Sequence, residues 1–531
     1  MPSQSNLRAL IIGGFLIALA VASGVSMARG ESVLRIAMTA GDLPDWAGQP
    51  DQGFEGYRFV GFNLYDGLVN WDLSTSDKEV DIRPALASAW HVDPADPRRW
   101  IFELRHGVRF HDGCAWNADA AVWNVERLTS DKSPAFSALN FARARARTNN
   151  FDTVEKINDE TIAITTKSVE SLFPYNMVFV LMMSPCAMEK AGNDYRAYAL
   201  APAGTGPYKF DKAVPHERLE LVRNTDYWDP ERVPKQDRVV LLPMPEASTR
   251  VAALLSGQVD FIEAPPPDAI ERLKSAGMRI VTNVYPHTWP YLVNFERGPF
   301  QDLRVRQAAN YAMNRADMVE MLNGVAVPSY GTYVPAQRYY GHPFEYKFDP
   351  DKAKTLLKEA GCSPCAITVA ISPSGSGQMQ PLPMNELVKE QLESVGFKVT
   401  FDTVDWNTLL DIYIRGAVRY PQYDAINFSS GASDPLNFLK VYMSHYKAPL
   451  GPNWGGYANA EVDDLATRAL ASFDDAERTA LITKVHEITT KDAARLFIVS
   501  DLNPRALSPK VTGFVQAQSW FQDITPIVVA P

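Results

Sequence analysis

The polar loop that ends at Asp434 carries the residue types best suited to binding a small molecule. It reads INFSSGASDP, in which Asn427, Ser429 and Ser430 are compact hydrogen-bonding groups beside the aromatic ring of Phe428. Closed small-molecule sites combine aromatic walls with a few placed polar groups. Asp434 could present a carboxylate to a cleft, but an Asp followed by Pro is also a standard helix start. We favour the helix cap.

Four tryptophans could stack on a bound molecule. Trp46 lies in the first turn-rich loop, and Trp289, Trp406 and Trp454 lie further along the chain. Each could instead pack in a core, and for Trp46 and Trp406 the two interpretations are balanced. We expect the loss of Phe428 or Trp406 to cost ligand affinity while leaving the stability of the unliganded protein nearly unchanged.

The sequence lacks the short motifs of several enzyme classes. It contains no G-x-S-x-G, no G-x-x-x-x-G-K-[ST] and no H-E-x-x-H. The segment GTGP at 204–207 suggests a phosphate cradle, but its proline lacks an N–H and we interpret it as a structural turn. His106 and His111 could chelate a metal, yet a chance pair among 8 histidines is the simpler interpretation and favours surface residues. We therefore expect no catalytic residue, no cofactor and no bound metal.

The four cysteines are even in number, which favours disulfides in an oxidising compartment. Cys362 and Cys365 are close enough for a local bridge. Cys114 and Cys186 would form the remaining pair. A zinc site is the competing interpretation, which a single C-x-x-C without a nearby His pair supports only weakly.

Hydrophobic patterns predict the strands and helices that position these residues. Residues 33–38 read as a short strand, and apolar alternation over 100–104 and 108–110 predicts a hairpin closed by a His-Gly turn. Asn117 is a suitable N-cap for a helix at 118–128. Strands and helices alternate along the rest of the chain, which predicts mixed α/β lobes.

The sequence of residues 86–128 closely resembles that of the bacterial extracellular solute-binding proteins of family 5, the dipeptide, oligopeptide and nickel-binding class. GTGPYKF at 204–210 is similar to a family segment, and 300–329, 348–361 and 453–488 follow in the family order. Members of this family are the receptor components of ABC importers. The resemblance therefore implies a small-molecule solute and an inner-membrane ABC permease as partners, and a monomer.

The resemblance also implies the architecture, an α/β two-lobed periplasmic-binding-protein (Venus-flytrap) fold with an extra subdomain in lobe one. Ligand would bind between lobes that close by hinge bending. Asn294 matches a family position near the hinge, where it could hold backbone instead of ligand. On this template lobe one comprises 31–75, 205–288 and 505–531, the extra subdomain 76–204, and lobe two 289–504.

The N-terminus reads as a secretory signal peptide over 1–28, with Arg8 as its positive residue and an apolar run that follows. We expect cleavage after Ala28 and, since no later segment is long and apolar enough to span a membrane, a protein free in the periplasm of a Gram-negative cell. The net charge of −10, without a long basic run, gives no reason to expect nucleic acid.

Two departures from dipeptide-binding relatives bear on the ligand. Those relatives anchor the peptide amine with an acidic residue shortly before the Asp-Pro step, where this chain has Gly431. Their carboxylate-binding Arg lies ahead of a lobe-two helix, where residues 371–386 contain no Arg. Both departures disfavour free dipeptides, and the remaining groups favour neutral ligands rich in hydroxyls or amides.

The predicted function is a periplasmic receptor that binds a peptide-like or conjugated polar solute, such as an opine, a glycoside or an amino-acid–sugar adduct. A carrier of a metal chelate or haem is an alternative in the same class. From other classes we keep a secreted hydrolase that pairs Asp45 with Asp434, and a periplasmic chaperone or sensor-interaction protein. Basic residues for a chelate or haem would come from Arg58, Arg143, Arg145 and Arg147, although we place the run ARARAR on a solvated helix face.

Overall fold

The computed structural model describes residues 31–375, 377–432 and 434–531. Residues Ser32–Pro531 fold as one unit. The predicted signal peptide, 1–28, lies outside the described residues. Within the described ranges, no helix is both long and apolar enough to cross a membrane.

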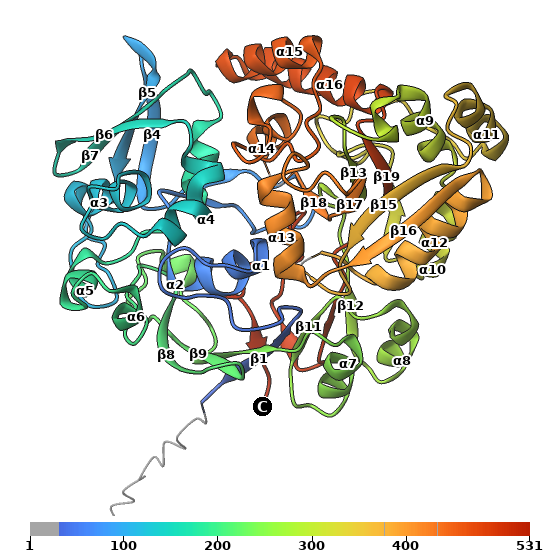
Figure 1. The fold of residues 1–531 in the computed structure, drawn as a ribbon. Coiled ribbons are helices and arrows are strands. Elements are labelled where there is room, and N and C mark those ends of the chain that lie inside the picture. Colours follow the sequence, from blue (N-terminus) through green and yellow to red (C-terminus); the bar gives the residue numbers. More distant parts are fainter. Residues whose placement is uncertain (1–30, 376, 433) are drawn as a thin grey trace, which may run out of the picture. The chain divides into compact units, whose positions relative to one another are not determined.

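Seven strands form the first sheet, in which the N-terminal strand is central (Figure 1). The strands are β1 (Val33–Met38), β8 (Tyr208–Val214), β9 (Arg218–Arg223), β10 (Arg238–Pro243), β11 (Phe261–Glu263), β12 (Arg279–Val281) and β20 (Arg505–Leu507). Their order is β12-β20-β11-β1-β10-β9-β8, and β1 pairs in parallel with both β10 and β11. The strand predicted at 33–38 is confirmed, with Leu34 and Ile36 fully buried.

A separate four-stranded sheet follows β1 in the chain. It consists of β4 (Ala87–Asp93), β5 (Asp96–Leu104), β6 (Phe151–Asn158) and β7 (Thr161–Thr166), in the order β4-β5-β7-β6. The predicted helix at 118–128 is confirmed as α3 (Ala118–Thr129), and the Asn117 side chain caps it by accepting the N–H of Ala120 at 3.0 Å.

The return strand predicted at 108–110 is wrong. The neighbours of β5 are β4 and β7, not the segment that follows it. Val108 and Phe110 are buried, as their alternation predicts, but the Phe110 N–H donates to the carbonyl of Cys114 at 2.9 Å within a local loop. Alternation therefore identified the buried face correctly and the strand partner incorrectly.

The turn at 204–207 is held by close packing. A Cβ on Gly204 would lie 2.0 Å from the carbonyl oxygen of Leu64, and one on Gly206 would lie 2.5 Å from that of Asn63. The His111 ring bonds to this turn, with Nε2 at 2.9 Å from the Gly206 carbonyl, and burial lowers the His111 pKa to about 4. His111 is therefore not the surface residue predicted, whereas His106 is exposed.

The second seven-stranded sheet contains β13 (His287–Val293), β14 (Ala326–Pro328), β15 (Cys365–Ile371), β16 (Phe397–Thr403), β17 (Ala425–Asn427), β18 (Ser430–Gly431) and β19 (Arg495–Asp501). Its order is β14-β19-β13-β17-β15-β16, and β18 also pairs with β13. Every residue of β13 and β19 is buried, which marks these strands as the core of the sheet. Short pairs are formed by β2 (Val69–Trp71) with β3 (Ile82–Pro84) and by β21 (Val511–Thr512) with β22 (Val528–Val529).

Helices pack around the sheets, and α9 and α10 contact β19 while α12 contacts β16 (Figure 1). Many begin at a capping side chain, as at Asn459 and Asp474. The helices other than α3 are α1 (Phe54–Gly56), α2 (Phe62–Leu64), α4 (Ala138–Thr148), α5 (Pro185–Lys190), α6 (Tyr195–Tyr198), α7 (Ala247–Leu255), α8 (Ile270–Ser275), α9 (Leu303–Tyr311), α10 (Arg315–Met321), α11 (Pro350–Glu359), α12 (Pro381–Ser394), α13 (Trp406–Arg415), α14 (Pro435–Lys440), α15 (Ala460–Ala471) and α16 (Asp475–Lys491).

The chain crosses between the two large sheets at two adjacent places. It leaves the first sheet after β12 and enters the second at β13, and it returns between β19 and β20. The crossings lie side by side, since the N–H of Asn283 donates to the carbonyl of Leu502 at 2.9 Å. The predicted α/β two-lobed fold is confirmed, while the boundaries given for the lobes and the extra subdomain stay a prediction.

Two disulfides are formed within the described residues, Cys114–Cys186 and Cys362–Cys365. The first joins residues 72 apart in sequence and the second residues 3 apart. A bridge that closes a longer loop removes more entropy from the unfolded chain. The first bridge should therefore contribute more to stability.

We expect the double change Cys114→Ser/Cys186→Ser to lower the free energy of unfolding by about 2–4 kcal/mol. Denaturant unfolding of the oxidised protein measures this. The matched control is Cys362→Ser/Cys365→Ser, for which the smaller loop predicts a smaller loss. A larger loss in the control than in the first variant would contradict the argument from loop length.

Candidate functional site

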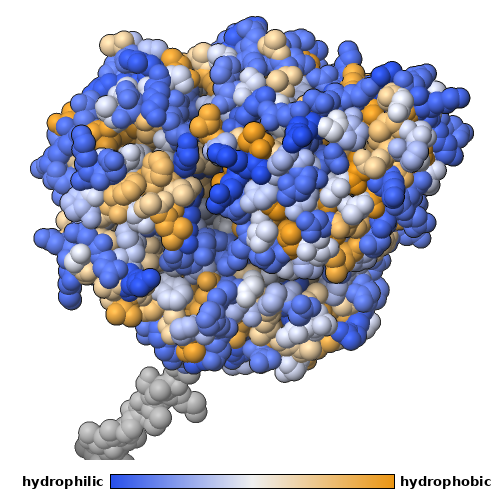
Figure 2. All heavy atoms as spheres, in the orientation of Figure 1, coloured by the Kyte–Doolittle hydropathy of each residue, from blue (hydrophilic) through white to orange (hydrophobic). Residues whose placement is uncertain are grey.

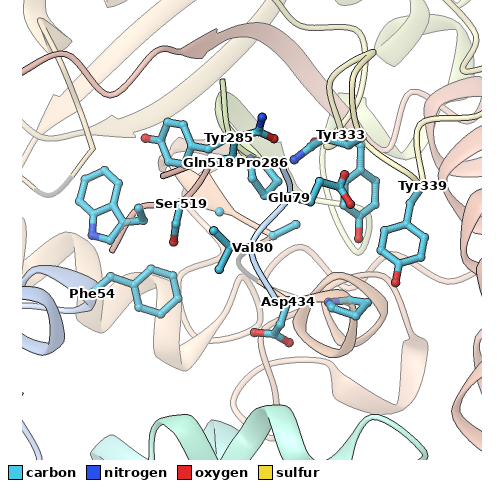
Figure 3. Close-up of a pocket in the computed structure, with 15 residues that line it drawn as sticks. Phe54, Glu79, Val80, Tyr285, Pro286, Tyr333, Tyr339, Asp434, Gln518 and Ser519 are labelled. Atoms are coloured by element: carbon cyan, nitrogen blue, oxygen red, sulfur yellow. The ribbon is translucent and has the colours of Figure 1, made fainter. Parts of the chain in front are cut away.

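A cavity enclosing about 570 Å³ of empty space, open solvent included, lies beside the crossing segments (Figure 3). Its walls come from separate stretches of chain: the start of α1, the loop before β3, the first crossing, a loop before α11, the start of α14 and the C-terminal segment. The lining residues include Phe54, Glu79, Val80, Tyr285, Tyr333, Tyr339, Gly431, Asp434, Gln518 and Trp520. No Lys, Arg or His is among the described residues that line it.

Asp434 occupies one side of this cavity with both carboxylate oxygens engaged. Oδ1 caps α14 by accepting the N–H of Asn437 at 2.7 Å. Oδ2 accepts from Nη1 of Arg147 on α4 at 2.9 Å, and the Asp434 side chain is fully buried. The Arg147 guanidinium also lies 4.0 Å from the centre of the Phe179 ring. The preferred interpretation of Asp434 as a cap agrees with this geometry, and the ion pair neutralises its charge.

Glu79 is the other carboxylate of the cavity. Its Oε1 accepts the main-chain N–H of Arg338 at 2.8 Å. Burial raises the pKa of Glu79 above its ordinary value, although the N–H of Arg338 and the charge of the Arg338 guanidinium oppose the rise. The Arg338 guanidinium itself pairs with Asp475 at 2.7 Å, so it is engaged elsewhere.

Aromatic rings form much of the wall. Tyr333 is 4% exposed, and burial raises its pKa well above the ordinary value, so its hydroxyl is neutral. The Tyr333 Oη has no hydrogen-bond partner among the described residues. Trp520 stacks on His287, with ring centres 5.1 Å apart, and carries the guanidinium of Arg58 at 4.3 Å from its centre. These rings give the cavity apolar area beside the polar side chains of Glu79, Gln337, Asp434, Gln518 and Ser519.

A second cavity enclosing about 840 Å³ of empty space, open solvent included, shares Trp520 with the first as a lining residue. It is bounded by the buried pair Arg58–Glu263, by the second crossing and by residues 373–375, 377 and 379–381 of a loop that contains two glycines. Burial raises the pKa of Glu263, and the adjacent Arg58 opposes that rise. Both cavities therefore lie where the two sheets and the crossing segments meet. Figure 2 shows that this face of the molecule is also hollowed between the surfaces that carry α4 and α13, with both hydrophilic and hydrophobic residues around the hollow.

Four predicted ligand contacts are buried within the second lobe. Trp289 has none of its surface exposed. Asn427 and Trp454 donate to main-chain carbonyls at 3.2 and 3.1 Å. Asn294 bonds main chain through both ends of its amide, which favours the backbone role. None of the four lines either cavity.

Two predicted contacts, Trp406 and Ser429, pack against the glycine-containing loop that lines the second cavity, and Phe428 stacks on Trp406. Phe428 lies between Trp406 and Tyr413, with ring centres 5.4 and 4.3 Å away and planes within 8° of parallel. A Cβ on Gly375 would lie 2.3 Å from Cε3 of Trp406, and one on Gly377 would lie 2.8 Å from Oγ of Ser429. The loop can approach these side chains so closely only because it is glycine-rich.

The remaining predicted contacts are divided between the cavity and other parts of the fold. Trp46 donates from Nε1 to the carbonyl of Ala199 at 2.9 Å and stacks on Phe210, so it packs in lobe one. Ser430 lies in β18, where its carbonyl accepts from Thr288. Of the residues predicted to bind ligand, only Asp434 lines the first cavity, together with its neighbour Gly431.

The run ARARAR lies on α4 and is not uniformly solvated. Arg145 is exposed, but Arg143 pairs with Asp45 at 2.7 Å and Arg147 is buried against Asp434. The prediction of a solvated face is therefore wrong for Arg147. The hydrolase pairing of Asp45 with Asp434 is not supported either, because each carboxylate has its own arginine.

The sequence-based site missed most of the cavity wall. Glu79, Tyr333 with Tyr339, and Trp520 come from three segments that are far apart in the chain. None of them belongs to a local motif, so only the arrangement in space shows that they share a cavity.

Comparisons with known proteins place this arrangement among solute receptors. The family described as bacterial extracellular solute-binding proteins, family 5 Middle, matches residues 81–449. The glutathione-binding protein GsiB of Escherichia coli K12 is 28% identical over 464 residues, which are 86% of each chain.

Two solved structures are similar to this chain over most of its length. The ABC transporter-associated periplasmic binding protein DppA from Helicobacter pylori, in complex with the peptide STSA, is 25% identical with a TM-score of 0.82, over 94% of this chain and 98% of that one. A dipeptide-binding protein from Pseudoalteromonas sp. SM9913, in complex with Met-Leu, is 22% identical with a TM-score of 0.81, over 94% of this chain and 100% of that one. The second likeness concerns the fold alone.

Proposed function

The chain belongs to family 5 of the bacterial extracellular solute-binding proteins, non-enzymatic binding components of ABC transporters, and from this we propose that it captures a small peptide-like or conjugated polar solute. The observation that carries the proposal is the aromatic cavity beside the crossing segments, with Asp434 and Glu79 as its carboxylates. A peptide-like solute offers both the apolar area and the hydrogen-bonding groups that such a wall can use.

Capture requires the two lobes to separate and close around the solute. The cavity wall combines the first crossing and the C-terminal segment with the start of α14. A ligand that contacts all three segments would therefore stabilise their closed arrangement. Ligand that contacts only the closed form shifts the population toward it. The closed form is then the one presented to an inner-membrane permease.

The proposal includes a cellular setting, which the signal-like sequence of residues 1–28 and the family support. We place the protein in the periplasm, after removal of residues 1–28, as a monomer that meets its permease at the inner membrane. A receptor of this kind needs no chemistry at its site, and selectivity comes from groups that a wrong solute leaves without partners.

Thermal unfolding of the refolded, ligand-stripped protein against defined compounds tests the function. One set contains the peptide Ser-Thr-Ser-Ala, Met-Leu and glutathione, a second contains opines and glycosides, and a third contains nickel chelates and haem. A ligand at about 100 times its dissociation constant stabilises the folded state by roughly 2.7 kcal/mol. Stabilisation by the first or second set supports the proposal. Stabilisation by the third set alone, or by none, contradicts it.

A further inference from the structure

Only one of the two carboxylates that line the first cavity forms an ion pair with a cationic side chain of the described residues. Asp434 faces the guanidinium of Arg147 at 2.9 Å, so that pair carries no net charge. Glu79 makes no ion pair with any described residue, and its carboxylate accepts a main-chain N–H, that of Arg338. No cationic side chain lines the cavity within the described part of the chain. The empty cavity therefore carries one negative charge without a paired cation, an arrangement that is costly to enclose.

An unpaired hydroxyl lies in the same wall. Tyr333 is 4% exposed, its Oη has no hydrogen-bond partner among the described residues, and it lines the same cavity as Glu79 (Figure 3). Buried polar groups are usually satisfied, so each exception needs an explanation. A ligand group that bonds the Tyr333 hydroxyl and is attracted to Glu79 would account for both features.

We propose that Glu79 holds a cationic amine of the solute in this cavity, with Tyr333 as a second polar contact and the aromatic rings around them. This inference rests on the proposed function and specifies its substrate class. Position 431, where dipeptide-binding relatives are expected to carry an acidic anchor, is glycine in this chain. The negative charge for the amine then comes from the loop before β3, a different part of the cavity wall. Rings such as those of Tyr339 and Phe54 add attraction for a cation.

A purely structural role for Glu79 makes a different prediction. Glu79 could serve only to accept the N–H of Arg338 and so hold two segments together. Glutamine at position 79 keeps a carbonyl oxygen for that bond and removes only the charge. Glu79→Gln therefore separates the positioning role from binding of a cation.

Calorimetric titration with Ser-Thr-Ser-Ala and glutathione, each compared with its N-acetylated form, tests the inference on the native protein. Acetylation removes the positive charge of the amine. We expect at least a tenfold loss of affinity on acetylation, since hydrogen bonds to charged groups are worth about 1.5–3 kcal/mol. Glu79→Gln should lower the affinity for the peptides with a free amine by about 10- to 100-fold, and it should leave the affinity for the acetylated forms unchanged.

Two further variants complete the design. Asp77→Asn removes the same charge from an exposed position two residues away, and it should leave both affinities unchanged. Tyr333→Phe removes a hydroxyl that has no hydrogen-bond partner among the described residues. It should therefore lower the affinity for the peptides with a free amine without lowering the unfolding temperature. Equal affinity of native protein and Glu79→Gln would overturn the inference and leave the proposed function standing. Binding of neither peptide by the native protein would overturn the inference, and the wider compound sets then decide the function.

The pH dependence of binding gives a readout that a structural role would not move. The charged and titratable groups near Glu79 are Arg338, Asp81, Tyr333 and Asp434. Because burial raises the Glu79 pKa, its carboxylate is lost as pH falls through that raised value while the ligand amine stays protonated. Affinity for the free amine should therefore fall as the solution is made acidic. Glu79→Gln keeps the other groups, so the affinity of this variant for the free amine should change less with pH over the same range. A fall as steep as that of the native protein would contradict the role of Glu79.

Discussion

Replacing Phe428 with alanine is expected to lower the free energy of unfolding of the ligand-free protein by about 3 kcal/mol or more. The Phe428 ring is only 9% exposed and lies between the parallel rings of Trp406 and Tyr413. It belongs to a core that also contains Leu409, Ile412 and other buried apolar side chains. Alanine would leave a cavity between two rings that cannot both move into it. Equilibrium unfolding in urea measures the loss.

Phe348→Ala is the matched control for Phe428→Ala. Phe348 is 49% exposed, so its truncation should change the free energy of unfolding by no more than about 0.5 kcal/mol. This expectation reverses the one drawn from the sequence, in which Phe428 contacts ligand and contributes little to stability. A Phe428→Ala protein of unchanged stability and much reduced ligand affinity would restore the ligand-contact role.

The two roles of Phe428 could not be separated from the sequence because residue type is the same in both. An aromatic ring beside small polar residues is as suitable for stacking on a neighbouring helix as on a ligand. The same ambiguity applies to Trp289 and Trp454, which are buried in the second lobe. Burial depends on which element covers the loop, and for Phe428 that element is α13, whose Trp406 and Tyr413 lie against the two faces of the ring.

Local patterns predicted the elements that depend on local forces. The strand at 33–38 and the capped helix after Asn117 follow from alternation and from an N-cap side chain, which act within a few residues. The partner of a strand is a non-local property, so the hairpin expected at 100–110 was wrong although its apolar residues are buried. The family resemblance supplied the two-lobed architecture that periodicity alone could not.

The cavity wall shows the same limit for the site. Glu79 lies in a polar stretch, SDKEVD, that looks like an ordinary solvated loop. Its importance arises from Tyr333 and Asp434, which the fold brings to the same cavity from much later in the chain. Arg147 was likewise indistinguishable from the exposed Arg145, because the helical position that faces α14 is set by packing.

Lys440→Met is expected to destabilise the protein by about 3–5 kcal/mol, because it leaves a buried carboxylate without its counter-ion. Nζ of Lys440 lies 3.2 Å from Oε2 of Glu170, and the two side chains are 3% and 1% exposed. Glu170 also accepts from the amides of Asn150 and Asn176, at 3.1 and 2.7 Å. Those amides satisfy hydrogen bonds but cannot balance the charge. Urea unfolding of single and double variants measures the effect.

The double variant Glu170→Gln/Lys440→Met separates loss of the pair from exposure of one unmatched charge. Removing both charges together should recover most of the stability that Lys440→Met loses, since replacing a buried pair by neutral groups is often nearly neutral. The exposed pair Lys274–Glu271 provides the control, and Lys274→Met should cost no more than about 1 kcal/mol. A double variant as unstable as Lys440→Met would show that packing, and not charge, explains the loss.

The position of this pair connects stability with the cavity. Lys440 lies at the C-terminal end of α14, and Asp434 caps the other end while pairing with Arg147. Both ends of this short helix are therefore held by charges from residues 147–170, outside the second sheet. If the lobes separate to admit a solute, both pairs must break or become hydrated, and the pairs then favour the closed form. Lys440→Met should consequently weaken ligand binding even though Lys440 does not line the cavity, whereas Lys274→Met should not.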